Sequence, residues 1–297
     1  MRPAYTWRLR TRELDLGPGT LIMGVLNVTP DSFSDGGRFF QPQAAVQHAI
    51  SMLDAGADII DIGGESTRPG SQAAPDAEAQ TGLPEDEELR RVMPVIEALR
   101  RERPQAILSI DTYKAAVARA AVEAGAEIVN DVSALRWDPA MAATVADLHC
   151  GVVLVHMRGR PADWRKLPPL EDGIALVSRE LRQWAETAMA AGVARERIVL
   201  DPGFGFGKNF FENYPLLARF EELHRLGLPM LAGPSRKSFI GRTLARDGRD
   251  APPDERLCGT LAAVTACILK GAHIVRVHDV RAAVDAARIA DAILATS

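Results

Sequence analysis

The sequence is poor in cysteine. It contains Cys150, Cys258 and Cys267 and no Cys-x-x-Cys pair. This odd number without paired spacing argues against a disulfide framework, and we interpret all three residues as buried free thiols. Free thiols of this kind are typical of a reducing compartment, so we expect a cytoplasmic protein.

Long apolar runs and an excess of basic residues are also missing. No segment approaches the ~20 apolar residues of a membrane span, and residues 1–12 are basic without the apolar stretch of a signal peptide. The formal net charge is −4, whereas a nucleic-acid-binding protein would carry a basic face. We therefore expect neither a membrane nor a nucleic acid as a partner. An anionic ligand must be bound by locally placed Arg, Lys or backbone N–H groups.

What remains is an ordinary globular composition: 297 residues, 47% hydrophobic and 25% charged, enough to bury a sizeable core. From residue 21 onward one cycle repeats, in which a short apolar run precedes a polar loop and an amphipathic helical pattern. The apolar runs are 21–26, 58–62, 106–110, 126–129, 151–155, 198–200, 229–232 and 273–277. The helical patterns lie near 42–56, 85–102, 113–124, 138–148, 171–191, 213–226, 255–270 and 279–295.

This alternation predicts an α/β fold, a (β/α)8 TIM barrel, as a single domain over residues 21–297. The apolar runs are continuous, as in parallel strands covered on both faces. A doubly wound open sheet is the alternative, but no Gly-x-Gly-x-x-Gly follows the first run. Residues 5–15 alternate at roughly period two, which predicts a short β-hairpin extension over residues 1–20. Glycines at the helix-to-strand joints are expected C-caps: Gly125, Gly151, Gly192, Gly227 and Gly271.

Polar side chains follow every apolar run, and in a barrel these strand ends share one face. A single Asp or Asn at such a position is more often a helix cap than a catalytic group. Eight such positions, some of them cationic, instead predict a convergent polar site. The candidates after the successive runs are Asn27, Asp61, Asp111, Asn130, His156, Asp201, Lys237 and Arg276 with His278.

The residue types restrict the ligand. Histidine and cysteine do not cluster, which argues against zinc or iron. Asp and Asn side chains with a lysine suit a polar heterocycle that has both donors and acceptors. Arg68, Arg276 and His278 suit a phosphate or diphosphate. A diphosphate would bring Mg²⁺, for which Asn27 can supply one oxygen. Residues 235–238 open a helix whose N-terminus suits a carboxylate.

Several residues have two possible roles. Lys237 is either a ligand contact or an ordinary surface lysine, and His156 is better explained as a satisfied core histidine. We expect one of Phe204 and Phe206 to form a pocket wall. Glu65 is better explained as a brace for its own loop than as a base.

Eight segments, in this order along residues 21–280, are similar to one family. They are 27–37 (NVTPDSFSDGG), 61–70 (DIGGESTRPG), 109–114 (SIDTYK), 130–133 (NDVS), 156–159 (HMRG), 201–208 (DPGFGFGK), 233–241 (GPSRKSFIG) and 276–280 (RVHDV). Through them the chain resembles the bacterial dihydropteroate synthases of the folate pathway. The resemblance implies that 6-hydroxymethyl-7,8-dihydropterin diphosphate and 4-aminobenzoate condense to 7,8-dihydropteroate and diphosphate. It also implies a barrel, Mg²⁺, commonly a homodimer, and competition by sulfonamides.

The same resemblance implies roles for individual residues. The pterin would contact Asp111, Asn130, Asp201 and Lys237, with Thr67 completing the site for the pterin diphosphate. The diphosphate would lie near Asn27 with its Mg²⁺ and against Arg276, His278 and Arg68. The aminobenzoate pocket would use Phe33, Thr67, Arg68, Pro69, Phe206, Lys237 and Ser238. Asp111, Asp201, Lys237, Arg276 and His278 would act in catalysis, while residues 28–37 close as a lid with residues 67–69.

The chain departs from the family pattern in places. The loop 70–85 is longer than expected, Glu212 stands where His is frequent, Ala134 where Gly is frequent, and Leu170 where Tyr is common. Two rival functions remain. One is a barrel that transfers a methyl group from methyltetrahydrofolate, which needs the pterin contacts without a diphosphate site. The other is a non-catalytic pterin-binding paralogue, which would have lost loop or anion-site residues.

Overall fold

The computed structural model describes residues 2–29, 42–65 and 82–296. Its central sheet has eight parallel strands in the order β8-β7-β6-β5-β4-β3-β10-β9. A parallel bridge between Leu200 and Met230 joins the two ends, so the sheet closes into a barrel. The strands are β3 (Leu21–Asn27), β4 (Ile59–Gly63), β5 (Ile107–Asp111), β6 (Ile128–Asp131), β7 (Gly151–Val155), β8 (Ile198–Asp201), β9 (Leu231–Ala232) and β10 (Ile274–Val277).

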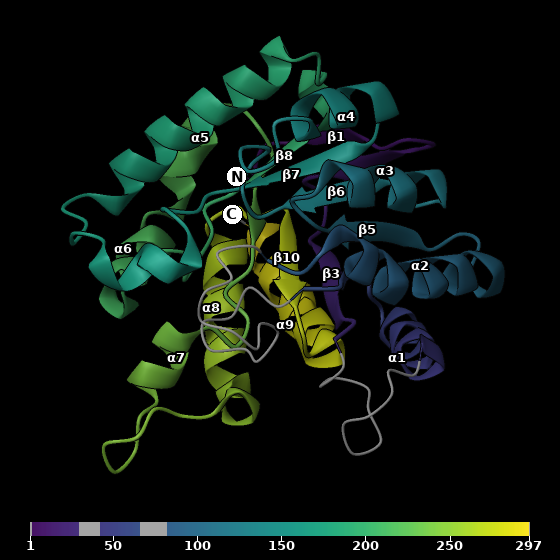
Figure 1. Cartoon of the computed structure of the whole chain (residues 1–297). Coiled ribbons are helices and arrows are strands. Elements are labelled where there is room, and N and C mark those ends of the chain that lie inside the picture. The colour runs from purple at the N-terminus through teal and green to yellow at the C-terminus, as the bar shows by residue number, and fades with distance from the viewer. Residues whose placement is uncertain (1, 30–41, 66–81, 297) are drawn as a thin grey trace.

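Helices lie outside the strands and cover the barrel, as Figure 1 shows. They are α1 (Pro42–Asp54), α2 (Glu85–Glu102), α3 (Ala115–Glu123), α4 (Met141–Leu148), α5 (Gly173–Ala190), α6 (Asn213–Ala218), α7 (Ser238–Thr243), α8 (Leu257–Leu269) and α9 (Val280–Leu294). Shorter 3-10 turns include η1 (Pro161–Lys166), η3 (Phe210–Glu212) and η4 (Phe220–Leu226). The predicted (β/α)8 fold is confirmed.

Two helical predictions needed correction. The segment 213–226 is not one helix, because Arg219 leaves the helical region (φ −112°, ψ 22°) and separates α6 from η4. Gly151 is not a C-cap, because α4 already reverses at His149, whose φ is 50°. Gly151 is instead the first residue of β7, where an added Cβ would lie 2.6 Å from Leu9. The other four glycines have positive φ, as expected of C-caps: Gly125, Gly192, Gly227 and Gly271.

The hairpin formed by β1 (Tyr5–Arg8) and β2 (Glu13–Leu16) packs against the amino-terminal end of the barrel. Trp7 and Leu16 are fully buried there, in one cluster with interior strand residues such as Ile59. The indole N–H of Trp7 donates to the Arg197 carbonyl over 2.8 Å. The predicted hairpin is confirmed, and it fills the end of the barrel opposite the carboxyl ends of the strands.

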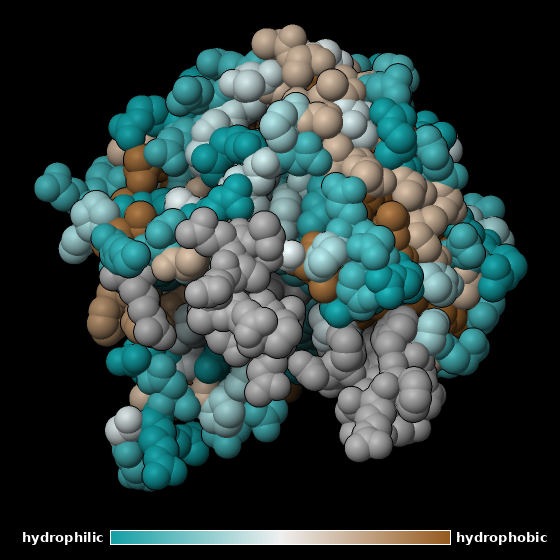
Figure 2. All heavy atoms as spheres, viewed as in Figure 1, coloured by the Kyte–Doolittle hydropathy of each residue, from teal (hydrophilic) through white to brown (hydrophobic). Residues whose placement is uncertain are grey.

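Alternate strand residues point into the barrel, and their character changes along its axis. Near the amino-terminal end they are apolar and form one core cluster, to which Met23, Val153 and Ile274 belong. Nearer the carboxyl ends they become polar. A larger apolar cluster lies between the strands and the helices. On the face shown in Figure 2, hydrophilic residues prevail and hydrophobic residues lie singly or in small groups.

The cysteine prediction holds for two residues of the three. Cys150 and Cys267 are buried free thiols, whereas Cys258 is exposed. Cys258 lies in the first turn of α8, a helix so rich in apolar residues that its sequence does not mark the outward face. Among the described helices, none has the length and apolar character needed to cross a membrane.

Candidate active site

A cavity of about 900 Å³ opens at the carboxyl ends of the strands. Every described residue to which the sequence assigned a ligand or catalytic role lines it: Asn27, Asp111, Asn130, Asp201, Phe206, Lys237, Ser238, Arg276 and His278. The other two strand-end candidates, Asp61 and His156, do not line it. The remaining predicted residues, Phe33, Thr67, Arg68 and Pro69, lie outside the described residues. So do residues 30–37 of the predicted lid and most of the long 70–85 loop. The strand-end pattern therefore brings one set of polar side chains together.

The floor of the cavity is a buried polar layer between β4, β5, β6 and β10. Arg276 donates from Nε to Asp61 and from Nη2 to Asp111, each over 2.6 Å. The Asn130 amide donates to the same oxygen of Asp61 over 2.9 Å. Asp61 is fully buried, and the sequence marked it as a strand-end candidate without a ligand role of its own. The signal that marks it is a carboxylate at an inward position within an otherwise apolar strand.

Two oxygen atoms of this layer have no hydrogen-bond partner among the described protein groups, Asn130 Oδ1 and Asp61 Oδ1. A buried acceptor without a donor costs about 1–3 kcal/mol. Asn130 lines the cavity, so its oxygen suits a ligand that brings an N–H group. The floor is thus chemically matched to a heterocycle with N–H donors.

Burial raises the pKa of Asp111 to about 7, with Arg276 opposing this shift and Asp61 adding to it. Two carboxylates share one guanidinium, and a quarter of the Asp111 side chain (26%) is exposed. In an unfolded chain the pKa of Asp is about 3.9. The folded state therefore binds more protons between about pH 4 and pH 7, and the free energy of unfolding falls as the pH rises through that window.

Replacing Asp111 by Asn should remove this pH-dependent fall in the free energy of unfolding, because the amide cannot ionise. At pH 8 we expect Asp111→Asn to unfold at a temperature about 2–4 °C above the wild type, or ~1 kcal/mol, and at pH 5 to differ much less. Thermal unfolding of both proteins from pH 5 to pH 8 measures this. Asp285→Asn on α9, where the side chain is 59% exposed, is the control. A temperature difference for Asp111→Asn that does not change with pH would contradict the assignment.

At the end of β8, Asp201 is buried and its Oδ1 accepts the backbone N–H of Gly203 over 2.7 Å. Burial raises the pKa of Asp201, while the Gly203 N–H and the nearby Lys237 lower it. Gly203 has φ 65°, and an added Cβ would lie 1.9 Å from the His156 carbonyl oxygen. This turn therefore requires glycine, and it holds the carboxylate at the cavity wall.

The cationic side of the cavity lies where β10 pairs with β3. The register places Arg276 opposite Met23 and Val277 opposite Gly24, so His278 and Asn27 follow on adjacent strand ends. His278 donates its backbone N–H to the Ser235 hydroxyl over 3.2 Å, and its ring Nδ1 lies 3.0 Å from the same oxygen. Ser235, after β9, lines the cavity; the sequence placed it in the helix opening 235–238 without a role of its own.

Of the residues with two possible roles, Phe206 and Lys237 lie in the cavity, whereas Phe204 and His156 lie in the core. Phe204 packs in the core, while Phe206 lines the cavity and has Lys237 Nζ 3.6 Å above its ring centroid. His156 is a fully buried core residue with Nε2 3.0 Å from Glu180, and burial lowers its pKa to about 3. It is only partly satisfied, because its Nδ1 has no hydrogen-bond partner among the described protein groups. Lys237 lines the cavity and is not a plain surface lysine.

Glu65 binds Lys114 over 2.7 Å and receives the Tyr113 hydroxyl, and Lys114 also binds Glu88. These contacts tie Glu65 to the segment after β5, while most of the loop that it was expected to brace lies outside the described residues. Glu65 also reaches the cavity. Trp164 is a cavity residue to which the sequence assigned no role. Ser238 is the first residue of α7, so the predicted helix opening is confirmed.

Comparison with known proteins places this fold and cavity in a class. Residues 23–278 match the family described as pterin binding enzyme. A dihydropteroate synthase of Escherichia coli (strain K12) is 45% identical over 273 residues, which cover 92% of this chain and 91% of the relative.

Solved structures agree. A Xanthomonas albilineans dihydropteroate synthase with 4-aminobenzoic acid is 44% identical, with a TM-score of 0.87 and 99% coverage of both chains. A Yersinia pestis dihydropteroate synthase in complex with a sulfonamide drug is 43% identical, also with a TM-score of 0.87, over 98% of this chain and 100% of the other. The protein is a pterin-binding barrel enzyme. Within that class the chain belongs to the dihydropteroate synthase family.

Proposed function

We propose that the chain condenses 6-hydroxymethyl-7,8-dihydropterin diphosphate with 4-aminobenzoate, giving 7,8-dihydropteroate and diphosphate. The observation that carries this proposal is that one cavity joins a buried carboxylate–amide floor to a cationic side on β10. A pterin has N–H donors and ring acceptors for the floor, and a diphosphate has the charge for the cationic side. Family membership supports the same reaction.

The pterin ring is held by Asp111, Asn130, Asp201 and Lys237 in this proposal. Carboxylate oxygens and the unpartnered Asn130 Oδ1 accept its N–H groups, while Lys237 donates to a ring acceptor. The ring thus lies over the buried polar layer, with its hydroxymethyl carbon directed toward β10 and β3. We also propose that Thr67, which lies outside the described residues, contacts the pterin diphosphate.

Bond cleavage begins with departure of the diphosphate from a carbon attached to an electron-rich ring. Arg276 and His278 stabilise the charge on the leaving oxygens, and the bonds of Arg276 to Asp61 and Asp111 orient its guanidinium in advance. The positive charge that develops on the pterin is stabilised by Asp111 and Asp201. Arg276 contacts Asp111 directly, so the leaving-group side and the pterin side are electrostatically linked.

The donor groups fit Mg²⁺ as a companion of the diphosphate. Among the residues that the structure describes, no three His, Cys, Asp or Glu side chains gather into a metal site. Mg²⁺ in phosphate-transfer sites needs only one or two protein oxygens, with substrate phosphates and water completing its shell. Asn27 on the neighbouring strand end would supply one such oxygen. When bound, Mg²⁺ neutralises phosphate charge.

The aminobenzoate occupies the outer part of the cavity against Phe206, with Lys237 and Ser238 near its carboxylate. Phe33, Thr67, Arg68 and Pro69 are proposed to complete this pocket. The aniline nitrogen attacks the electron-poor carbon once the diphosphate has left, and the anilinium that forms then loses its proton to solvent. An anilinium is acidic, so this step needs no strong general base. Alignment of the two substrates supplies much of the rate enhancement. We propose that sulfonamides compete for this pocket.

Two further proposals concern the whole molecule. The chain forms a homodimer, and it works in the cytoplasm, where the exposed Cys258 and the buried Cys150 and Cys267 stay reduced. We also propose that residues 21–297 are the catalytic domain and residues 1–20 its extension. The hairpin shares one apolar cluster with the barrel interior, which supports an extension of the same domain and not a separate unit.

One assay separates the synthase from its two rivals. Purified protein is mixed with the pterin diphosphate and Mg²⁺, with or without 4-aminobenzoate, and diphosphate release is measured. We expect release that depends on aminobenzoate and falls when EDTA removes Mg²⁺. Absence of release under all conditions would sink the synthase proposal. Methyl transfer from methyltetrahydrofolate would then favour the first rival, and pterin binding alone the second.

A further inference from the structure

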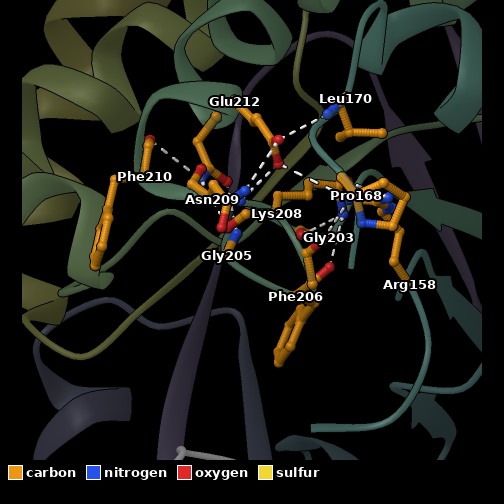
Figure 3. A network of polar contacts seen from close by, with 12 residues as sticks. Arg158, Pro168, Leu170, Gly203, Gly205, Phe206, Lys208, Asn209, Phe210 and Glu212 are labelled. Atoms are coloured by element: carbon orange, nitrogen blue, oxygen red, sulfur yellow. Dashed lines mark hydrogen bonds and ion pairs between the residues drawn. The ribbon is translucent and has the colours of Figure 1, made fainter. Parts of the chain in front are cut away.

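The loops that follow β7 and β8 are fastened together by charged side chains (Figure 3). Lys208 is only 6% exposed. Its Nζ lies within hydrogen-bond distance of the carbonyl oxygens of Gly203 (2.8 Å), Phe206 (3.2 Å) and His156 (3.3 Å). An ammonium group has three protons, so each can be donated to one of these acceptors. The buried Lys208 therefore links the loop after β8 to the end of β7.

Arg158 also links the loop after β7 to the loop after β8. Its Nη1 donates to the Gly207 carbonyl over 3.1 Å, and its Nη2 donates to the Pro168 carbonyl over 2.9 Å. Gly207 belongs to the β8 loop and Pro168 to the β7 loop. The planar guanidinium thus spans both segments, which a lysine could not do with the same geometry.

Glu212 is the third side chain that links the two loops. Its Oε1 accepts the backbone N–H of Leu170 over 2.8 Å, and its Oε2 accepts that of Asn209 over 2.6 Å. Its Oε2 also lies 3.9 Å from Arg158 Nη1, and the Glu212 side chain is only 12% exposed. A carboxylate offers two acceptor oxygens, whereas the histidine frequent here in the family offers at most one acceptor.

The joined loops carry two aromatic rings that line the cavity. Phe206 extends away from the polar network in Figure 3, and the Trp164 ring meets it edge to face at 6.0 Å between centroids. Trp164 comes from the β7 loop and Phe206 from the β8 loop. Their mutual geometry therefore depends on how the two loops are held, and Arg158 and Glu212 hold both.

We propose that Arg158 and Glu212 are positioning residues for the aromatic amine. By joining the two loops they fix Phe206 and Trp164 as one wall of the cavity, and so set the affinity for 4-aminobenzoate. Neither residue belongs to the pterin or diphosphate contacts. This inference rests on the proposed function, because it assigns the aromatic wall to the second substrate.

Glu212→Ala tests the inference through both Michaelis constants. We expect the KM for 4-aminobenzoate to rise about 10-fold, with kcat and the KM for the pterin diphosphate changing less than about twofold, because only binding of one substrate is lost. Glu212→Gln should raise the KM for 4-aminobenzoate less than Glu212→Ala does, since its amide oxygen is still an acceptor. Arg158→Ala should act in the same direction, and the double variant should be less than additive.

The matched control is Glu221→Ala, which removes an exposed glutamate that pairs with Lys270 on the surface. A purely structural role for Glu212 would lower the melting temperature and leave the ratio of the two KM values unchanged, and that result would overturn the inference. Should Glu212→Ala fail to fold, Glu212→Gln and Arg158→Lys carry the same comparison.

Binding provides a readout without turnover. The variants should bind 7,8-dihydropterin as the wild type does but bind 7,8-dihydropteroate about 10-fold more weakly. Equal weakening for both ligands would refute a role confined to the amine. A wild-type protein that neither turns over nor binds dihydropteroate would overturn the proposed function and the inference with it. An active wild type with unaltered variants overturns the inference alone.

Discussion

Arg276→Ala is expected to lower kcat/KM for the pterin diphosphate by about 10²–10³-fold. Arg276 lies on the cationic side of the cavity, and its bonds to Asp61 and Asp111 fix it there before substrate arrives. Removing one preorganised donor from a site of charge development costs about 2.7–4 kcal/mol in enzymes. Steady-state kinetics with both substrates varied measure the effect.

Controls distinguish this loss from damage to the fold. Arg281→Ala removes an exposed arginine from α9 and should leave kcat/KM unchanged. Arg276→Lys keeps the charge but cannot hold both carboxylates at once, so it should fall between the wild type and Arg276→Ala. Wild-type kinetics in a folded Arg276→Ala protein would move the diphosphate to another part of the cavity.

Lys237→Ala is expected to lower kcat/KM for both substrates by about 10–100-fold. Lys237 lies between the proposed pterin contact at Asp201, to which it is electrostatically coupled, and the ring of Phe206. A hydrogen bond to a charged group contributes about 1.5–3 kcal/mol, and here the loss acts on two ligands. The readouts are the two KM values and the affinity for 7,8-dihydropterin alone.

The matched variant is Lys270→Ala, in which an exposed lysine that pairs with Glu221 is removed from the C-terminal end of α8. Its kinetics should equal those of the wild type. If Lys237→Ala matches Lys270→Ala in all three measurements, Lys237 is not a substrate contact.

Much of the fold follows from local pattern. The eight strands begin within two residues of their predicted starts, because each is a short apolar run between a helix end and a polar loop. The break after α6 was missed, since it depends on the backbone of Arg219 and not on a proline or glycine there. The exposure of Cys258 depends on which side of an almost wholly apolar helix faces outward.

The site was predictable as a set of residues but not as a set of contacts. Asp111, Asp201 and Arg276 follow apolar runs, and a barrel brings such positions together. The link from Arg276 to Asp61 joins residues 215 positions apart, and it follows from strand register and side-chain direction. Sequence spacing carries no information on it. The contacts of Arg158 and Glu212 with the two loops could not be predicted from the sequence for the same reason.

The most direct test is a crystal structure of the protein with 7,8-dihydropteroate bound. We expect the pterin between Asp111, Asn130, Asp201 and Lys237, with Asn130 Oδ1 accepting a ring or amino N–H. The aminobenzoate part should lie against Phe206, and the bond formed by the enzyme should face Arg276 and His278. Product bound outside this cavity, or with the pterin at Phe206 and the aminobenzoate on the carboxylate floor, would contradict the account.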